Sequence, residues 1–207
     1  MTQAITALSK SSSSARGTLR RQLRDARNQL TKRQQQQAAE GAAQQLMMDP
    51  GLYRCRHLAA YLANDGELDP HALIERAWAR GITVYLPVLH PIRANRMWFC
   101  AYTPDTPLAR NRFGILEPVD VAHRRAPWAL DVVVMPLVGF DPYGGRLGMG
   151  GGFYDRTFAF KHRSPGFGPK LIGLGHDVQC VERLPVAPWD IPLTQIVTGS
   201  RCYRDSG

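Results

Sequence analysis

Six glycines fall within nine residues, between Gly144 and Gly152, and Arg146 lies among them. Because glycine has no Cβ, a loop of this kind lets backbone N–H groups approach a phosphate closely. Arg146 adds a fixed cation, and Asp155 adds a carboxylate just past the loop that could hold a divalent metal against the same phosphate. The spacing therefore predicts a site for a phosphorylated ligand.

The loop matches neither of the common nucleotide-binding fingerprints. A P-loop needs Lys and then Ser or Thr after its last glycine, whereas Phe153 and Tyr154 follow here. The dinucleotide pattern also fails, because Phe153 stands where a third glycine is required after Gly148 and Gly150. A flexible or tight-turning surface loop is the alternative interpretation. The charged residues around the loop favour the anion site.

The elements on either side of the loop support that site. Residues 131–138 form an apolar run typical of a buried strand, and residues 153–161 can start a helix. In a strand–loop–helix arrangement, free N–H groups and the positive end of the helix dipole converge on a bound anion. The loop is therefore expected between the end of a strand and the start of a helix.

A strand–helix–strand unit precedes this segment. Residues 57–62 predict a strand, residues 70–80 a helix capped by Asp69, and residues 82–87 a second strand. Such a unit implies a parallel pair of strands. The pattern also predicts a helix over 34–48, an edge strand over 97–103, a long loop over 104–127, and strands over 171–175 and 195–198.

These elements predict an α/β fold: a three-layer domain with a mostly parallel central sheet and helices on both faces. Ligands of such sheets gather at the carboxyl ends of the strands, where the glycine loop and residues 62–67 both lie. Residues 15–207 are expected to form this single domain. The serine-rich residues 1–14 are expected to be a disordered tail.

The first predicted helix of the domain has two distinct faces. Its apolar stripe consists of Leu19, Leu23, Ala26 and Leu30. The adjacent face carries Arg16, Arg20, Arg24 and Arg27. Because these residues recur at helical spacing, we expect the helix to dock through its leucines and to present its arginines to a ligand.

The composition restricts the partners. A net charge of +9 favours anionic partners. A nucleic-acid-binding module remains an alternative, although aromatic and basic residues are not interleaved as in stacking platforms.

No apolar run reaches the ~20 residues of a membrane span, and the N-terminus lacks a signal peptide's apolar core. Four scattered cysteines without CxxC spacing suit a reducing cytoplasm rather than a zinc site. We expect a cytoplasmic monomer.

The glycine block resembles that of the 5-formyltetrahydrofolate cyclo-ligase family, also called methenyltetrahydrofolate synthetases. The matching residues are 139–141 (GFD), 145–148 (GRLG) and 150–156 (GGGFYDR). Three further segments match in the family's order, namely residues 16–20, 62–69 and 184–190. The resemblance extends from about Arg16 to Val197.

The resemblance implies ATP- and Mg²⁺-dependent closure of 5-formyltetrahydrofolate to 5,10-methenyltetrahydrofolate, with release of ADP and phosphate. The ATP-binding residues it implies are Arg16, Gly17, Thr18, Leu19, Arg20, Arg146, Leu147, Gly148, Met149, Gly150, Gly151, Gly152 and Phe153. The substrate-binding residues are Leu62, Glu67, Gly148, Met149, Gly150, Gly151 and Gly152, with Glu67 accepting bonds from the pterin ring. The metal ligands are Asp155 and Asp190. Catalytic roles fall to Arg146 and Tyr154.

Two positions depart from the family pattern, and two alternatives stay open. The family usually has Lys where Arg16 stands, and often Arg or Tyr where Met149 stands.

Tyr154 could instead belong to the aromatic core. The rival function is a phosphate-binding isomerase or a CoA-transferase-like enzyme on a related α/β scaffold. The set of Arg146, Asp155 and Asp190 favours a metal-bound nucleotide over that rival.

Overall fold

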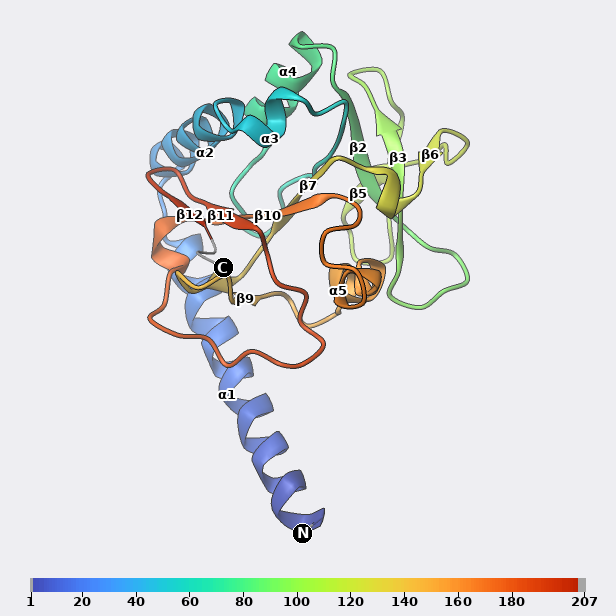
Figure 1. Ribbon diagram of the computed structural model, residues 1–207. Helices are drawn as coiled ribbons and strands as arrows, with labels where there is room; N and C mark the ends of the chain where they lie inside the picture. The colour runs from blue at the N-terminus through green and yellow to red at the C-terminus, as the bar shows by residue number, and fades with distance from the viewer. Residues whose placement is uncertain (1, 205–207) are drawn as a thin grey trace.

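The structure is a computed structural model that describes residues 2–204, with side chains from residue 15 onward. Within those residues, eight strands form one sheet in the order β12-β11-β10-β7-β1-β2-β3-β6 (Figure 1). The parallel strands are β1 (His57–Ala59), β2 (Thr83–Leu89), β7 (Val132–Pro136), β10 (Lys170–Leu174) and β11 (Gln195–Val197). The antiparallel strands are β3 (Met97–Tyr102), β6 (Arg124–Arg125) and β12 (Cys202–Arg204).

Helices cover both faces of the sheet. One face packs against α2 (Lys32–Met47), α3 (Pro50–Tyr53) and α4 (His71–Ala79), and the other against α5 (Phe153–Thr157) and a 3₁₀ turn, η2 (Ala159–His162). Side chains alternate along each strand, so Val132 and Val134 join the first core while Val133 and Met135 join the second. The predicted three-layer, mostly parallel α/β fold is confirmed.

Several predicted boundaries were wrong. The strand over 97–103 is not an edge, because β6 pairs outside β3. The predicted loop 104–127 contains β6 and a hairpin of β4 (Leu108–Arg110) and β5 (Leu116–Pro118). Likewise, the glycine segment begins with a hairpin of β8 (Gly139–Phe140) and β9 (Arg146–Leu147). Strands of two or three residues are too short to show an alternating pattern in the sequence.

The helix after the glycine loop is shorter than predicted. It ends at Thr157 and continues as the η2 turn, which occupies much of the rest of the predicted helix over 153–161. Helix α4 begins one residue later than expected, with Pro70 rather than Asp69 at its N-cap. Asp69 still accepts the His71 N–H through Oδ1 at 2.9 Å. A single turn of helix carries a weaker dipole, so anion binding must depend more on loop N–H groups and arginines.

Helix α1 (Thr2–Asn28) begins far from the sheet and approaches it toward its C-terminal end (Figure 1). There, Arg27 contacts the Leu137 carbonyl just after β7. Its range includes most of the predicted tail over 1–14, but Met1 lies outside the described residues. The side chains of residues 2–14 are not described either, so the division into tail and domain stays a prediction. Among the described residues, no helix is long and apolar enough to cross a membrane.

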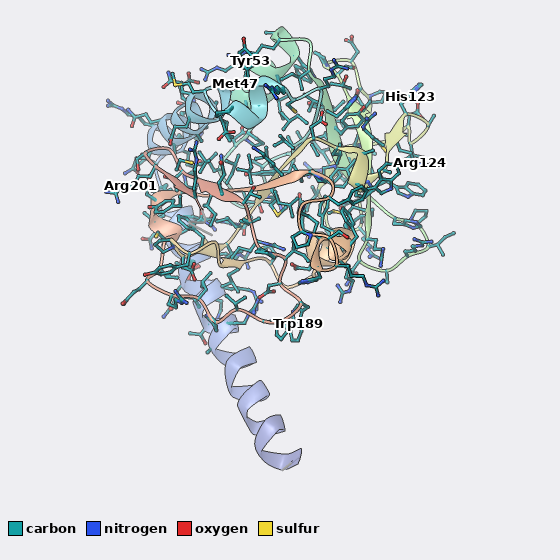
Figure 2. The ribbon with its side chains drawn as sticks, in the orientation of Figure 1. Met47, Tyr53, His123, Arg124, Trp189 and Arg201 are labelled. Atoms are coloured by element: carbon teal, nitrogen blue, oxygen red, sulfur yellow. The ribbon has the colours of Figure 1, made fainter. Side chains whose placement is uncertain are left out.

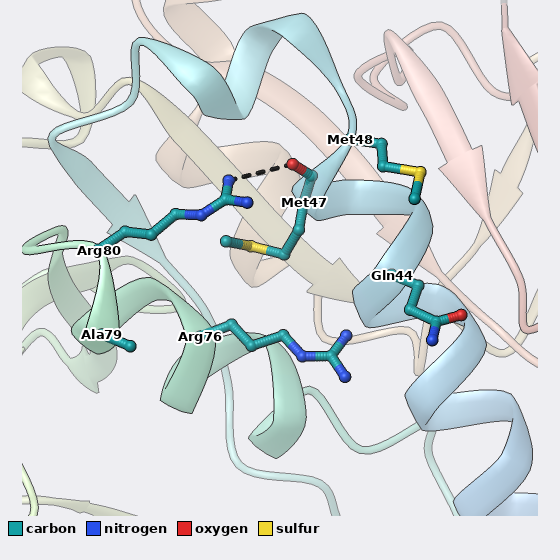
Figure 3. A pocket seen from close by; sticks show the side chains of 6 residues that line it. All are labelled: Gln44, Met47, Met48, Arg76, Ala79 and Arg80. Carbon is teal, nitrogen blue, oxygen red and sulfur yellow. Dashed lines mark hydrogen bonds between the residues drawn. The ribbon is translucent and has the colours of Figure 1, made fainter.

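One hollow of about 340 Å³ lies between α2 and α4. Met47, Met48, Arg76 and Arg80 are among its lining residues, and Arg80 donates to the Met47 carbonyl at 3.1 Å (Figure 3). Arg76 is paired with Glu40. No predicted site residue lines this hollow, which lies on the helical face rather than at the carboxyl edge of the sheet.

Candidate active site

The candidate site lies where the parallel strands end. The turn carrying Glu67 follows β1, the glycine loop follows β7 and the β8–β9 hairpin, and His176 follows β10. Parallel strands bring their carboxyl ends to one edge of a sheet, and ligands of α/β proteins bind there. The predicted meeting of the glycine loop with residues 62–67 at this edge agrees with the structure.

The glycine loop exposes a row of backbone donors. Among the described residues, the N–H groups of residues 149–152 donate to no protein acceptor. Gly150 and Gly152 have φ values of 100° and 65°, a region that residues with a Cβ rarely adopt. Arg20 donates from Nε to the Gly148 carbonyl at 2.8 Å, and Asn95 from Nδ2 to the Gly151 carbonyl at 3.0 Å. The loop therefore turns its carbonyls toward the protein and keeps N–H groups for a ligand.

Asp141 braces the start of this loop. Its buried carboxylate accepts N–H groups of Tyr143 and Gly145 through Oδ1, at 3.0 and 2.9 Å. Oδ2 accepts the Leu184 N–H at 2.9 Å. A carboxylate with three backbone donors is well satisfied without a ligand. Asp141 thus ties the β8–β9 hairpin to the segment that leads to Asp190.

Arg146 and Asp155 form a partly buried ion pair across the site. Arg146 is buried on β9, and its Nη2 pairs with Oδ1 of Asp155 on α5. Its Nε also donates to the Ile191 carbonyl at 3.2 Å, and the Ile191 N–H donates to Asp155 Oδ1 at 3.1 Å. These bonds join the glycine loop, α5 and the C-terminal segment into one unit.

Arg16 and Asp190 form a second ion pair beside the first. Arg16 Nη1 lies 2.9 Å from Asp190 Oδ2 and 3.1 Å from the Pro185 carbonyl. The Ala187 N–H donates to the same carboxylate at 2.8 Å, which closes a tight turn. Trp189 projects from this turn into solvent with 68% of its surface exposed (Figure 2). Asp190 is therefore oriented by the protein before any ligand arrives.

The two predicted metal ligands, Asp155 and Asp190, are linked through Ile191, which follows Asp190 and donates to Asp155. Among the described residues, no cluster of three or more metal-ligating side chains exists. Mg²⁺ is commonly held by one or two carboxylates, with water and phosphate oxygens completing its octahedron. The donor set fits Mg²⁺ bound together with a nucleotide and would not suit zinc.

Glu67 lies half-buried on a tight turn close to Tyr61 and Tyr154. Burial raises the pKa of Glu67 to about 7, and the opposing effects of Arg27 and of the Asn64 N–H only partly offset it. Asn64 donates that N–H to Glu67 Oε2 at 3.2 Å. A carboxyl with such a pKa changes charge near neutrality, so a ligand that donates N–H groups can draw it into the ionised form.

Tyr154 connects the Glu67 turn with the glycine loop. Its ring stacks on Phe158 with 6.4 Å between centroids, which makes it part of the second core as well. Burial raises the pKa of its phenol, and the nearby Glu67 acts in the same direction. The hydroxyl therefore stays protonated near Glu67 and Arg146, where it can donate a hydrogen bond.

The remaining predicted residues occupy different surroundings. Gly17 and Leu19 are half-buried on α1 between Arg16 and Arg20, whereas Thr18 is exposed. Leu62 is half-buried at the start of the Glu67 loop, and Leu147 is buried on β9. Met149 is exposed at the tip of the glycine loop, and Phe153 packs edge-on against Phe113 with 5.7 Å between centroids.

The expectation that α1 presents all its arginines to a ligand was wrong. Arg16 and Arg20 face the glycine loop and Asp190, but Arg24 and Arg27 both bind Asp65. Arg27 is completely buried. Asp65 was missed in the sequence, although the Asn-Asp-Gly run at 64–66 is a turn signal that marks residues with positive φ.

The fold and this site define a class. A mostly parallel sheet carries an arginine-lined glycine loop and a buried carboxyl at its carboxyl edge, as expected for an α/β enzyme acting on a phosphorylated ligand. A sequence model of the 5-formyltetrahydrofolate cyclo-ligase family matches residues 12–199. The chain belongs to this family, which argues against the isomerase and CoA-transferase alternatives.

Individual relatives agree. The chain is 45% identical over 184 residues to the 5-formyltetrahydrofolate cyclo-ligase of Escherichia coli (strain K12), covering 88% of this chain and 99% of that protein. The Haemophilus influenzae cyclo-ligase is 41% identical over 185 residues, with 89% and 97% covered. The NMR structure of Aquifex aeolicus 5,10-methenyltetrahydrofolate synthetase superposes with a TM-score of 0.78 at 28% identity, covering 93% of each chain.

Proposed function

We propose that this protein uses ATP to close 5-formyltetrahydrofolate into 5,10-methenyltetrahydrofolate, releasing ADP and phosphate. Membership of the cyclo-ligase family supports this activity. The observation that carries it is that two subsites lie side by side. Glu67 lies near Tyr154, which directly follows the glycine loop. Arg20 and Arg146 lie on either side of that loop. One subsite suits a ring that donates N–H groups, and the other suits phosphates.

The reaction needs an activated formyl group. The formyl carbonyl on N5 is stabilised by resonance, so its oxygen first attacks the γ-phosphorus of ATP and ADP leaves. N10 then attacks the formyl carbon and gives up its proton to solvent, and inorganic phosphate leaves with the former carbonyl oxygen. Phosphoryl transfer of this kind depends on positioning and charge stabilisation more than on a protein nucleophile. No acyl- or phospho-enzyme is therefore required.

The residues of this chain supply those two effects. The N–H groups of residues 149–152 and the guanidinium groups of Arg16 and Arg20 would hold the phosphates. Arg146 would face the charge that develops on the transferred phosphoryl group, in an orientation that Asp155 keeps fixed. Tyr154 would line the space between phosphate and pterin.

Mg²⁺ would bind between Asp155 and Asp190. When bound, it neutralises charge on the phosphate oxygens. Asp155 Oδ1 accepts two bonds from the protein, and among the described residues its Oδ2 accepts none. Asp190 is oriented by Arg16 and the Ala187 N–H. Asp155 can thus direct Oδ2 to a metal without losing its protein partners, whereas both oxygens of Asp190 accept bonds from Arg16, so a metal would share that carboxylate with the guanidinium.

The oligomeric state and the cellular compartment are proposed from the sequence. We propose that the protein acts as a monomer in the cytoplasm, where its four free cysteines would stay reduced. Size-exclusion chromatography with light scattering tests the first statement. A dimer at micromolar concentration would contradict it.

The activity is tested with purified protein, ATP, Mg²⁺ and 5-formyltetrahydrofolate. We expect methenyl product, detected by its absorbance, to form in a 1:1 ratio with ADP and phosphate. Omission of ATP should abolish product formation. If ATP is hydrolysed but no cyclised folate forms, the proposal fails.

A further inference from the structure

The turn that carries Glu67 has a strained backbone. The Glu67 N–H donates to the Asn64 carbonyl at 3.0 Å, and the two residues between them have positive φ: 51° for Asp65 and 73° for Gly66. Gly66 adopts this conformation freely, but a residue with a Cβ such as Asp65 is destabilised in it. The turn therefore needs contacts from outside to hold its shape.

Helix α1 provides most of those contacts through Arg27. Its Nε donates to the Asp65 carbonyl at 2.8 Å, and its Nη2 lies 2.8 Å from Asp65 Oδ2. Its Nη1 also reaches the Leu137 carbonyl, just after β7, at 3.4 Å. The side chain is completely buried, so a single guanidinium joins α1, the turn and the end of β7.

Two further contacts close the other sides of the turn. Arg24 Nε donates to Asp65 Oδ2 at 2.7 Å, from a more exposed position on α1. His176, buried after β10, lies with Nε2 3.2 Å from the Gly66 carbonyl. Because the turn is held from α1 and from β10, Glu67 can move little relative to the glycine loop.

We propose that Arg27 is a positioning residue for substrate binding, which sets both the orientation and the charge of the Glu67 carboxyl without touching the substrate. The proposal rests on the proposed function for the role of Glu67. It assigns to a buried arginine a role in folate recognition, beyond the phosphate-facing roles of Arg16 and Arg20.

The charged and titratable groups around Glu67 define what Arg27 does electrostatically. They are Arg27 on α1, Asp65 on the same turn, Tyr61 after β1 and Tyr154 on α5. Arg24 on α1 and His176 after β10 contact the same turn at Asp65 and Gly66. Burial raises the pKa of Glu67, Asp65 acts in the same direction, and Arg27 opposes both. Removal of the guanidinium should therefore raise the pKa of Glu67, and removal of the Asp65 charge should lower it.

These opposite signs separate positioning from a merely structural role. Both Arg27→Met and Asp65→Asn remove the ion pair between the two side chains, so both should destabilise the turn, and Arg27→Met more so because it also loses the bonds to the Asp65 and Leu137 carbonyls. Only an electrostatic effect on Glu67 shifts the pH midpoint of folate binding in opposite directions in the two variants. Arg27→Lys keeps the charge but loses the forked geometry, so it should retain the pH dependence and restore part of the affinity.

The experiment measures 5-formyltetrahydrofolate binding by calorimetry between pH 5.5 and 9, without ATP. Arg21→Met is the matched control, since Arg21 is exposed on the same helix. We expect Arg27→Met to weaken folate binding about tenfold and to raise the pH midpoint of binding by about one unit. Asp65→Asn should lower the midpoint, and Mg-ATP binding should change less than about twofold in every variant.

A second measurement reads Glu67 directly. Carbon NMR of the glutamate carboxyls, assigned with Glu67→Gln, gives the pKa of Glu67 in the ligand-free protein. Opposite shifts in Arg27→Met and Asp65→Asn show that Arg27 sets the charge of Glu67, whether or not folate binds. If wild-type protein does not bind folate, the proposed function fails, and with it the role of Arg27 in folate recognition. If Arg27→Met does not fold, the test rests on Asp65→Asn, which should lower the pKa of Glu67. Unchanged pKa and midpoint in the folded variants would overturn it.

Discussion

At the scale of single residues, Glu67 is the clearest case of a side chain whose environment indicates a role. Burial holds its pKa at about 7, within reach of physiological pH. Carboxyls that are buried beside few donors are rare unless a ligand completes their hydrogen bonds. A pterin ring would supply N–H donors to both oxygens.

Replacement of Glu67 by Gln should weaken folate binding and leave ATP binding almost unchanged. An amide cannot accept charge-assisted bonds through both terminal atoms, so we expect a loss of about 1.5–3 kcal/mol in folate binding. Separate calorimetric titrations with 5-formyltetrahydrofolate and with Mg-ATP measure the two effects. Equal losses for both ligands, or none for either, would remove Glu67 from the folate subsite.

Arg146→Ala should lower both activity and stability. Its place in a glycine-rich loop would by itself predict an effect mainly on activity. The structure corrects this, since Arg146 is buried and paired with Asp155. Removal of one partner leaves a partly buried charge, which costs about 3 kcal/mol, and loss of the cation facing phosphate should reduce kcat about 100-fold or more.

Urea unfolding and steady-state kinetics check this prediction. The exposed Arg163 offers a matched control, because Arg163→Ala removes the same charge from the surface. A double replacement, Arg146→Ala with Asp155→Ala, should recover stability but not kcat. Normal kcat in folded Arg146→Ala protein would contradict the catalytic assignment.

At the scale of elements, α1 serves both subsites. Its first two site arginines, Arg16 and Arg20, contact Asp190 and the glycine loop, and the next two, Arg24 and Arg27, hold the turn that carries Glu67. Residues at this spacing lie along one side of a helix. Because α1 is one rigid element, displacement at the phosphate end would be felt at the turn that carries Glu67.

Asp155 on α5 and Asp190 on the C-terminal segment should act together on Mg²⁺. Both are held by arginines and are joined through Ile191, so they cannot move independently. In a double-mutant cycle with Asp155→Asn and Asp190→Asn, the Mg²⁺ concentration for half-maximal rate should rise non-additively. Strictly additive effects would show that they do not share a metal. A Mg²⁺ requirement that neither variant changes would place the metal elsewhere.

At the scale of the whole molecule, Glu67 makes stability depend on pH. Its pKa is about 7 in the folded protein and 4.5 in the reference state, so its protonated form favours folding. Its contribution is fully present below pH 4.5 and is lost as the pH rises through 7. The difference in unfolding free energy between Glu67→Gln and wild type should therefore grow from near zero to on the order of 2 kcal/mol.

Urea unfolding of the two proteins between pH 4.5 and 8 measures that difference. The comparison cancels contributions from His57, His90 and His176, whose pKa values are lowered by burial and which act in the opposite direction. A constant difference across this range would mean that Glu67 has an ordinary pKa. If the difference shrinks as the pH rises, the pKa of Glu67 is lowered rather than raised in the folded protein.

The sequence by itself determined the fold class and predicted a phosphate site at the glycine loop. Apolar runs such as 131–138 must be buried on both faces, which requires a covered, mostly parallel sheet. A block of glycines around Arg146 lets the backbone approach an anion closely, which favoured a phosphate site over a plain surface loop. The family resemblance of that block and of segments 62–69 and 184–190 predicted Glu67, Asp155 and Asp190 as members of one site.

Tertiary structure decided how those residues are held. Asp65 and Arg27 are 38 positions apart, and no local pattern indicates that they bind each other. The pairing of Arg146 with Asp155 likewise depends on how α5 packs against β9. Charge, burial and orientation arise from contacts between segments distant in the chain, and local periodicity carries no information about such contacts. For that reason, the role of Arg27 could be inferred only from the folded protein.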